Sequence, residues 1–376
     1  MIYKLLLLLL FSISLSDKKS EVNQKISFDR SNAITDAVAL VSPSVVGINV
    51  TQLKKQSIDP FFDPFFDPFF DPFFKRHHQR TYKIKNLGSG VIISSDGYIV
   101  TNSHVVENAN EIIVSCVDGE TYEAVIVGID ELTDIALIKL ESQNDFPYVN
   151  LGDSDNLIVG EWVIALGNPL GLFDISNQPT ATVGIVSGIG LDFGQKESGK
   201  VYQNMLQTDA SINSGNSGGP LVNVFGDVIG INTFIMTSSN YNEGSIGIGF
   251  AIPINSVKLI VSELKKYGKI ERDFITGLHV QRLDRNMQKA LKIEGKTGLI
   301  ITDIDKGSSG EISGLMVGDV ILAVNDKSIG SVSDVIKVIN EGLHKVGDFI
   351  TLGVLRKEKM VDIELELMSK KEGVFY

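Results

Sequence analysis

A glycine-rich turn that contains one serine, Gly215-Asn216-Ser217-Gly218-Gly219-Pro220, has the residue types that nucleophilic catalysis needs. A serine hydroxyl is a weak nucleophile at neutral pH, so it requires an adjacent base and donors for the oxyanion that its attack creates. The flanking glycines allow a tight turn that exposes the hydroxyl and directs backbone N–H groups, notably those of Gly215 and Ser217, at that oxyanion. On its own, the segment also fits an ordinary glycine-rich turn.

A histidine and an aspartate earlier in the chain could supply the base and the group that orients it. His104, one of five histidines, follows the apolar segment 98–101, and Asp134 opens the apolar segment 135–140. An aspartate there is costly unless it has a partner, which a histidine N–H would provide. Each residue alone also has a structural explanation. Together with Ser217 they follow the His, Asp, Ser order of chymotrypsin-type enzymes and predict a catalytic triad.

The elements that must position these residues are predominantly strands. Between residues 88 and 253 the chain alternates short apolar segments with Gly, Asn and Asp and has no long helical pattern, which indicates antiparallel barrels or sandwiches. Helical spacing over 254–266, closed by Gly268, marks a domain boundary. Residues 270–368 contain further strands and a helix predicted over 333–341, typical of a small, partly open barrel.

Composition excludes several functional classes. The chain of 376 residues has a formal net charge of −12, with no basic stripe or zinc-finger spacing, which argues against a nucleic-acid partner. Its one cysteine, Cys116, excludes an intramolecular disulfide framework and a cysteine-based metal site. Because Cys116 lies in the apolar run 112–117, we expect a small buried residue rather than a nucleophile. We predict no metal and no cofactor.

The N-terminus has the features of an export signal. Lys4 precedes an apolar run over residues 5–15, and Asp17 follows a serine-rich stretch. A basic start, a short apolar centre and small residues near a cut predict a cleaved signal peptide over residues 1–16 and a periplasmic protein. An uncleaved short membrane anchor is the alternative.

A repeat interrupts the strand pattern. Asp-Pro-Phe-Phe occurs four times over residues 59–74, and Lys75-Arg76-His77-His78 follows. Because repeated proline is incompatible with helices and central strands, we expect a flexible loop over residues 52–86. Eight of the 19 phenylalanines lie in the repeats and would be exposed, so the barrel cores must be built from Val, Ile and Leu. The loop either contacts substrates or other subunits, or it is a tolerated insertion.

Four segments closely resemble the HtrA/Deg family of serine proteases: 101–106, 132–137, 215–220 and 249–253. The resemblance covers nearly all of the mature chain and implies a mainly β fold, a chymotrypsin-like double β-barrel followed by a single PDZ domain. The expected organisation is a signal peptide over 1–16, a protease domain over 28–258, the end of a linker helix over 259–271 and a PDZ domain over 272–368.

The resemblance also implies further site residues. The oxyanion loop would be Gly215, Asn216 and Ser217. The substrate cleft would be lined by a segment that pairs with the substrate backbone by strand addition, namely Thr233, Phe234, Ile235, Met236 and Thr237. The PDZ ligand loop would fall at Ile275, Thr276, Gly277 and Leu278. Thr276 departs from the hydrophobic residue or glycine that is commoner there.

The resulting hypothesis is an exported, ATP-independent serine endopeptidase that degrades unfolded or damaged proteins in envelope quality control. As a member of this family it would form a homotrimer or a higher oligomer and bind C-terminal peptides at the PDZ domain. Two alternatives stay open: a chaperone-type scaffold that holds unfolded chains without cutting them, and a membrane-anchored signalling protease.

Overall fold

The computed structural model describes residues 30–57, 79–168, 177–213, 215–235, 245–291, 293 and 295–370. The predicted signal peptide and the Asp-Pro-Phe-Phe repeats lie outside this part of the chain. Within it, no helix has both the length and the apolar character needed to cross a membrane.

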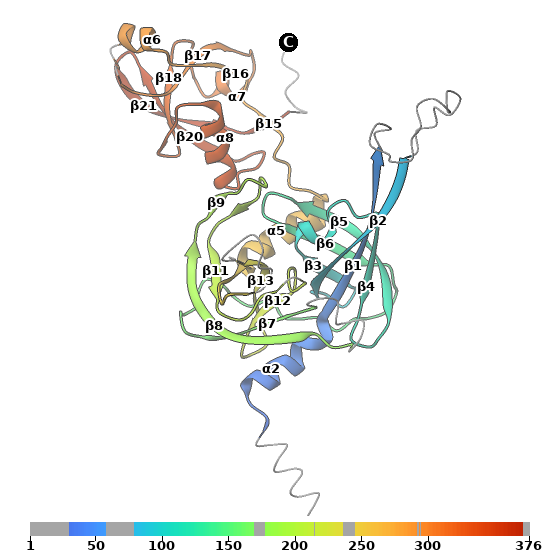
Figure 1. The fold of residues 1–376 in the computed structure, drawn as a ribbon. Helices are drawn as coiled ribbons and strands as arrows, with labels where there is room; N and C mark the ends of the chain where they lie inside the picture. Colours follow the sequence, from blue (N-terminus) through green and yellow to red (C-terminus); the bar gives the residue numbers. More distant parts are fainter. Residues whose placement is uncertain are drawn as a thin grey trace, which may run out of the picture.

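The first six-stranded unit is a closed antiparallel barrel in the order β1-β2-β3-β6-β5-β4 (Figure 1). Its strands are β1 (Val45–Ser57), β2 (Gln79–Ile92), β3 (Tyr98–Thr101), β4 (Glu111–Ser115), β5 (Thr121–Asp130) and β6 (Ile135–Leu140). Strands β1 and β2 pair from Val45 with Val91 out to Ser57 with Gln79. The flexible loop predicted over 52–86 is therefore too long, because the backbone ladder continues through residues 52–57 and 79–86.

The second six-stranded unit is also closed, in the order β11-β14-β13-β12-β7-β8. Its strands are β7 (Trp162–Gly167), β8 (Thr180–Leu191), β11 (Met205–Thr208), β12 (Pro220–Asn223), β13 (Val228–Ile235) and β14 (Gly249–Pro253). Between β8 and β11 the chain forms a separate small hairpin of β9 (Gly194–Gln195) and β10 (Val201–Tyr202). This hairpin returns toward the first barrel, where the Val201 N–H donates to the Leu132 carbonyl at 2.7 Å.

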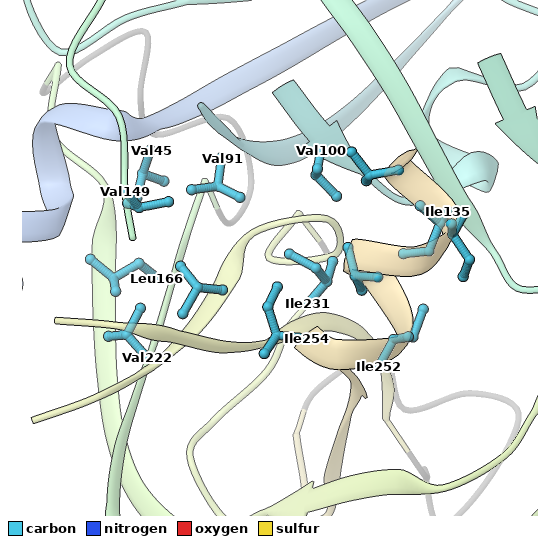
Figure 2. Packing of buried hydrophobic residues seen from close by; sticks show 14 of the residues in the cluster. Val45, Val91, Val100, Ile135, Val149, Leu166, Val222, Ile231, Ile252 and Ile254 are labelled. Atoms are coloured by element: carbon cyan, nitrogen blue, oxygen red, sulfur yellow. The ribbon is translucent and has the colours of Figure 1, made fainter. Parts of the chain in front are cut away.

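The largest apolar cluster joins the two barrels instead of filling either one. Figure 2 shows side chains of both barrels meeting there, namely Val45, Val91, Val100 and Ile135 of the first and Leu166, Val222, Ile231 and Ile252 of the second. Two further clusters fill the interiors of the individual barrels. Among the described residues the buried apolar side chains are mostly Val, Ile and Leu, with Phe146 and Phe250 as the buried phenylalanines. The interface on which the site depends is thus held by continuous burial of apolar surface.

Two helices flank the barrels. Helix α2 (Ala33–Val41) begins at a capping box formed by Asn32 and Thr35 and leads through a short 3₁₀ turn, η1 (Ser42–Ser44), into β1. Helix α5 (Ile254–Tyr267) buries Ile254, Val257, Ile260, Val261 and Leu264 against both barrels and ends at Gly268, which has a φ of 74°. The helix predicted over 254–266 and its glycine stop are confirmed.

The C-terminal unit is a sheet in the order β16-β17-β18-β20-β21, with β19 paired to β18 (Figure 1). The sheet strands are β16 (Leu278–Arg282), β17 (Leu299–Ile304), β18 (Val320–Val324), β19 (Lys327–Ser328), β20 (Phe349–Arg356) and β21 (Lys359–Glu366), and a separate pair is β15 (Phe274–Ile275) with β22 (Met368–Ser369). Its helices are α6 (Arg285–Ala290), α7 (Ser309–Ile312) and α8 (Val332–Glu341). The predicted mainly β fold of two barrels followed by a smaller C-terminal unit is confirmed.

Candidate active site

His104 and Asp134 form a hydrogen-bonded pair in the first barrel, at its boundary with the second. His104 lies on the short helix α3 (Ser103–Val106), which begins directly after β3. Its Nδ1 is 2.8 Å from Asp134 Oδ2 and 3.0 Å from Oδ1. The Asp134 side chain is fully buried, whereas 38% of the His104 side chain is exposed. The aspartate can therefore orient the ring while the other edge of the imidazole remains accessible.

The backbone of Asp134 is locked in an unusual conformation. Its φ of 61° lies in the left-handed region, which aspartate tolerates better than most residues. The Asp134 carbonyl accepts the Ser103 N–H at 3.1 Å and the side-chain amide of Asn102 at 2.9 Å. These two bonds tie the segment before β6 to the start of α3, so the two segments that carry the pair are held together.

The Asp134 carboxylate accepts hydrogen bonds from several directions besides the His104 ring. Each donor lies within 3.2 Å: the His104 N–H, Ser103 Oγ, Lys200 Nζ, Tyr202 Oη and Thr233 Oγ1. Ser103 comes from α3, Lys200 and Tyr202 come from the β9–β10 hairpin, and Thr233 comes from β13. A carboxylate offers about four lone-pair positions, so its accepting capacity is fully used.

These contacts decide the charge state of the pair. Burial alone raises the pKa of Asp134, but the hydrogen bond and charge of His104 and the charge of Lys200 outweigh it and hold this pKa well below its usual range. The pKa of Tyr202 is raised by burial and by the Asp134 charge, so Tyr202 is a neutral donor. Asp134 is consequently an anion that can stabilise a protonated imidazole.

The serine turn connects two strands of the second barrel, β11 and β12, and contacts β2 of the first barrel. Gly215 and Gly218 have φ values of 96° and 85°. A Cβ at Gly218 would lie 2.2 Å from the Ser89 carbonyl oxygen, and a Cβ at Gly219 would lie 2.2 Å from that of Leu166. The glycines that the sequence suggested for a tight turn are thus required by backbone conformation and by close approach of neighbouring strands.

The hydroxyl of Ser217 points to β13. Its Oγ donates to the Thr233 carbonyl at 2.8 Å, and the Thr233 hydroxyl in turn donates to Asp134 Oδ2 at 2.9 Å. Because a serine has a single O–H donor, this hydroxyl is not donated to His104. The structure therefore brings the three predicted triad residues into one site, with the Ser217 hydroxyl oriented toward Thr233 and not toward His104.

Ser89, which the sequence did not single out, joins the two halves of the site. This fully buried residue lies on β2, and its Oγ donates to the Gly215 carbonyl at 2.5 Å and accepts the Asn168 N–H at 2.7 Å. Its backbone N–H donates to the Ser217 carbonyl at 2.9 Å. A small polar residue between Gly88 and Gly90 was the available signal in the sequence.

The predicted oxyanion loop offers two of its three amides. The Asn216 N–H donates to the Asn213 carbonyl at 3.0 Å, so it is used within the turn. The amides of Gly215 and Ser217 are the remaining candidate donors. Ser89 holds the Gly215 carbonyl, and the oxyanion role of the Gly215 and Ser217 amides stays a prediction.

The predicted binding residues are only partly described. Thr233, Phe234 and Ile235 lie on β13, next to the Ser217 turn, whereas Met236 and Thr237 lie outside the described residues. In the C-terminal unit, Ile275 ends β15 and Leu278 begins β16 at the edge of the sheet. Between them, the Thr276 carbonyl accepts the Gly310 N–H, and Gly277 has a φ of 65°.

The single cysteine behaves as expected. Cys116 is buried inside the first barrel, and burial raises the pKa of its thiol to about 12. A thiol in that environment stays protonated, so it is a poor nucleophile.

Comparison with known proteins agrees with this geometry. Residues 88–231 match the family of trypsin-like peptidase domains, and residues 275–367 match the PDZ domain family. A probable serine protease do-like from Buchnera aphidicola is 38% identical over 382 residues, which cover 96% of this chain and 77% of that protein. The chain belongs to the HtrA-type serine proteases.

Two further relatives show how much of the family architecture is shared. The periplasmic serine endoprotease DegP of Escherichia coli is 41% identical over 292 residues, 77% of this chain but only 59% of DegP. The solved structure of the HtrA-type protease AlgW with a decapeptide has 32% identity and a TM-score of 0.61 and covers 90% of this chain and 98% of AlgW. This HtrA-type protease is accordingly a serine endopeptidase with one PDZ domain.

Proposed function

We propose that the chain is an exported, ATP-independent serine endopeptidase that degrades unfolded or damaged proteins in the cell envelope. The observation that carries this proposal is the 2.8 Å pair between His104 and the fully buried Asp134, in the same site as the half-buried Ser217. It supplies a base, an anion that orients the base and a nucleophile at one interface. These are the groups that hydrolysis of an acyl bond requires.

Substrate binding would prepare the nucleophile. A polypeptide that pairs with β13 as an added strand would place a backbone N–H on the Thr233 carbonyl, which now accepts the Ser217 hydroxyl. The displaced hydroxyl would then turn to His104. Substrate binding and alignment of the nucleophile are thereby the same event.

The reaction follows from the roles of these groups. His104 takes the proton of Ser217 as its oxygen attacks the scissile carbonyl, and it passes that proton to the departing amine. Asp134 holds the imidazole and stabilises its charged form, while the amides of Gly215 and Ser217 hold the oxyanion. Water, deprotonated by His104, then hydrolyses the acyl-enzyme and restores Ser217.

The backbone-directed mode of binding suits unfolded chains. Strand addition uses main-chain hydrogen bonds and demands an extended segment, which folded proteins seldom expose. In the PDZ unit, the sheet-edge strand β16 begins at Leu278, the last residue of the predicted ligand loop. We propose that this edge captures C-terminal peptides and that the barrels cut the attached chain.

We propose that the chain assembles into a homotrimer and that an apolar surface next to helix α2 takes part in the contact. Leu40 and Phe225 are 65% and 77% exposed. Gly226, which follows Phe225, approaches the Leu40 side chain so closely that a Cβ there would lie 2.7 Å from it. Adjacent exposed apolar side chains of this size are typical of contacts between proteins.

Export to the periplasm is supported by the DegP relatives, which are named as periplasmic enzymes. The mass of the N-terminal peptide of the mature protein distinguishes a cleaved signal peptide from an uncleaved membrane anchor. A chain that begins near Asp17 has lost the signal peptide, whereas a chain that retains residues 5–15 is the membrane-anchored alternative.

The central experiment is digestion of a chemically unfolded protein by the purified mature chain, with Ser217→Ala as the control. We expect native enzyme to cleave it without ATP and the variant to lose activity by at least about 10³-fold, because the nucleophile is removed. Equal digestion by both proteins would contradict the mechanism. Absence of digestion by the native chain, together with equal suppression of aggregation by both, would favour the chaperone-type scaffold.

A further inference from the structure

Lys200 has no role in the catalytic steps described above. It lies on the β9–β10 hairpin just before β10, after a turn in which the Lys196 N–H donates to the Lys200 carbonyl at 2.8 Å. The next residue, Val201, anchors the hairpin to Leu132, two residues before Asp134. The hairpin therefore delivers Lys200 to the back of the His104–Asp134 pair.

The ammonium group of Lys200 is built into the site. Its Nζ is 2.7 Å from Asp134 Oδ1 and 2.7 Å from Ser103 Oγ, and only 14% of its side chain is exposed. Oδ1 of the same carboxylate is also 3.0 Å from His104 Nδ1. Two groups that can carry positive charge thus share one carboxylate oxygen.

The other groups around the carboxylate do not change this balance. Ser103, Thr233 and Tyr202 are neutral donors, and the pKa of Tyr202 is raised further by burial and by the Asp134 charge. The nearby carboxylate of Asp130 has its own cation, because it forms an ion pair with Arg272. Lys200 is thus the ammonium group that shares the Asp134 carboxylate with His104.

We propose that Lys200 is a positioning residue that sets the acidic limit of activity, an inference that rests on the proposed protease function. When His104 is neutral, Lys200 compensates the buried charge of Asp134 and holds the carboxylate in place. When His104 is protonated, Lys200 is a neighbouring like charge and disfavours the imidazolium. The base consequently stays in its unprotonated, active form to a lower pH than Asp134 alone would allow.

The test is the pH profile of kcat/KM on a fluorogenic peptide for native enzyme and for Lys200→Gln, Lys200→Met and Lys200→Arg. Both neutral variants should move the acidic limb to higher pH by about one unit, because they remove a like charge that shares Asp134 Oδ1 with the imidazole. The Arg variant keeps the charge and should retain the native limb. Tyr202→Phe, which removes a neutral donor from the same carboxylate, is the matched control and should move the limb much less.

A purely structural role predicts a different pattern. Loss of packing would lower kcat/KM by the same factor at every pH and leave the midpoint of the acidic limb in place. That result, or a shift in Lys200→Arg as large as that in Lys200→Gln, would overturn the proposal.

A second measurement keeps this inference separate from the protease function. In Ser217→Ala protein, the NMR signal of the His104 ring can be followed against pH without turnover, with His104→Gln used to assign it. The halfway point should rise by about one unit when Lys200→Gln or Lys200→Met is added. An unmoved halfway point refutes the role of Lys200, whereas a native enzyme that cleaves nothing refutes only the proposed function.

Discussion

Two buried aspartates, one in the protease barrels and one in the PDZ unit, have their negative charge compensated by different partners. Asp134 is fully buried in the protease barrels, and Asp319 is 2% exposed in the PDZ unit. Asp319 pairs with one guanidinium, since Arg356 Nε is 2.8 Å from Oδ1 and Nη2 is 2.6 Å from Oδ2. Asp134 instead shares its charge between His104, Lys200 and three hydroxyl groups.

The difference lies in what the partners can do. A guanidinium in a bidentate pair stays charged and fixes the carboxylate rigidly, which suits a purely structural acid. A histidine can gain and lose a proton at neutral pH, so its pairing with a carboxylate can be used in each reaction cycle. The chemical identity of the partner, rather than burial alone, separates the functional carboxylate from the structural one.

The largest expected effect comes from removing the charge of Asp134. Asp134→Asn should lower kcat/KM by about four orders of magnitude, because the amide cannot stabilise the imidazolium or hold the ring in the productive tautomer. Steady-state kinetics on a short peptide measure the loss, and circular dichroism verifies the fold. Asp319→Asn is the matched control and should leave peptide cleavage near the native rate. Activity of Asp134→Asn within tenfold of native would mean that catalysis does not need the charge of Asp134.

Arg356→Met tests whether the ion pair with Arg356 holds Asp319 in a purely structural role. This change leaves Asp319 buried without its cation and should lower the free energy of unfolding of the PDZ unit by about 2–4 kcal/mol. We place it below the full cost of breaking a buried pair because a quarter of the Arg356 side chain is exposed. Hydrogen exchange of the β18 and β20 amides measures the change, and cleavage of a short peptide should persist.

A double variant sharpens that result. Asp319→Leu combined with Arg356→Met replaces the pair by apolar side chains and should regain most of the lost stability, because no unpaired charge remains. If Arg356→Met alone is as stable as the native chain, Asp319 is not held by this pair.

Much of this organisation was predictable because it depends on residue type and order. Short apolar segments separated by Gly, Asn and Asp predicted the barrels, and Gly268 predicted the end of α5. His104, Asp134 and Ser217 were predicted as a triad from their chemistry and chain order. The ladder through 52–57 and 79–86 was missed, because backbone pairing between β1 and β2 continues there without an apolar pattern.

The partners of the site were not predictable for a different reason. Lys200 and Tyr202 are separated from Asp134 by more than sixty residues and reach it through a hairpin whose position depends on the bond between Val201 and Leu132. No local spacing encodes such a contact. In the sequence, Ser89 likewise looks like an ordinary residue of a glycine-rich strand. Its contact is with the Gly215 carbonyl in the serine turn, which lies far along the chain.

Ser89 allows the smallest and most selective test of the comparison, because it acts on the nucleophile without touching Asp134. Ser89→Ala frees the Gly215 carbonyl and should lower kcat by about 10–100-fold, less than loss of a direct oxyanion donor, while KM changes little. The acidic limb of the pH profile should stay in place, since no charge near His104 changes. Thr101→Val, which removes a buried hydroxyl that bonds the Ser89 carbonyl, is the matched control and should affect stability more than kcat. A Ser89→Ala enzyme with native kcat would mean that the turn holds its own shape, and that only the carboxylate side of the site depends on contacts between the barrels.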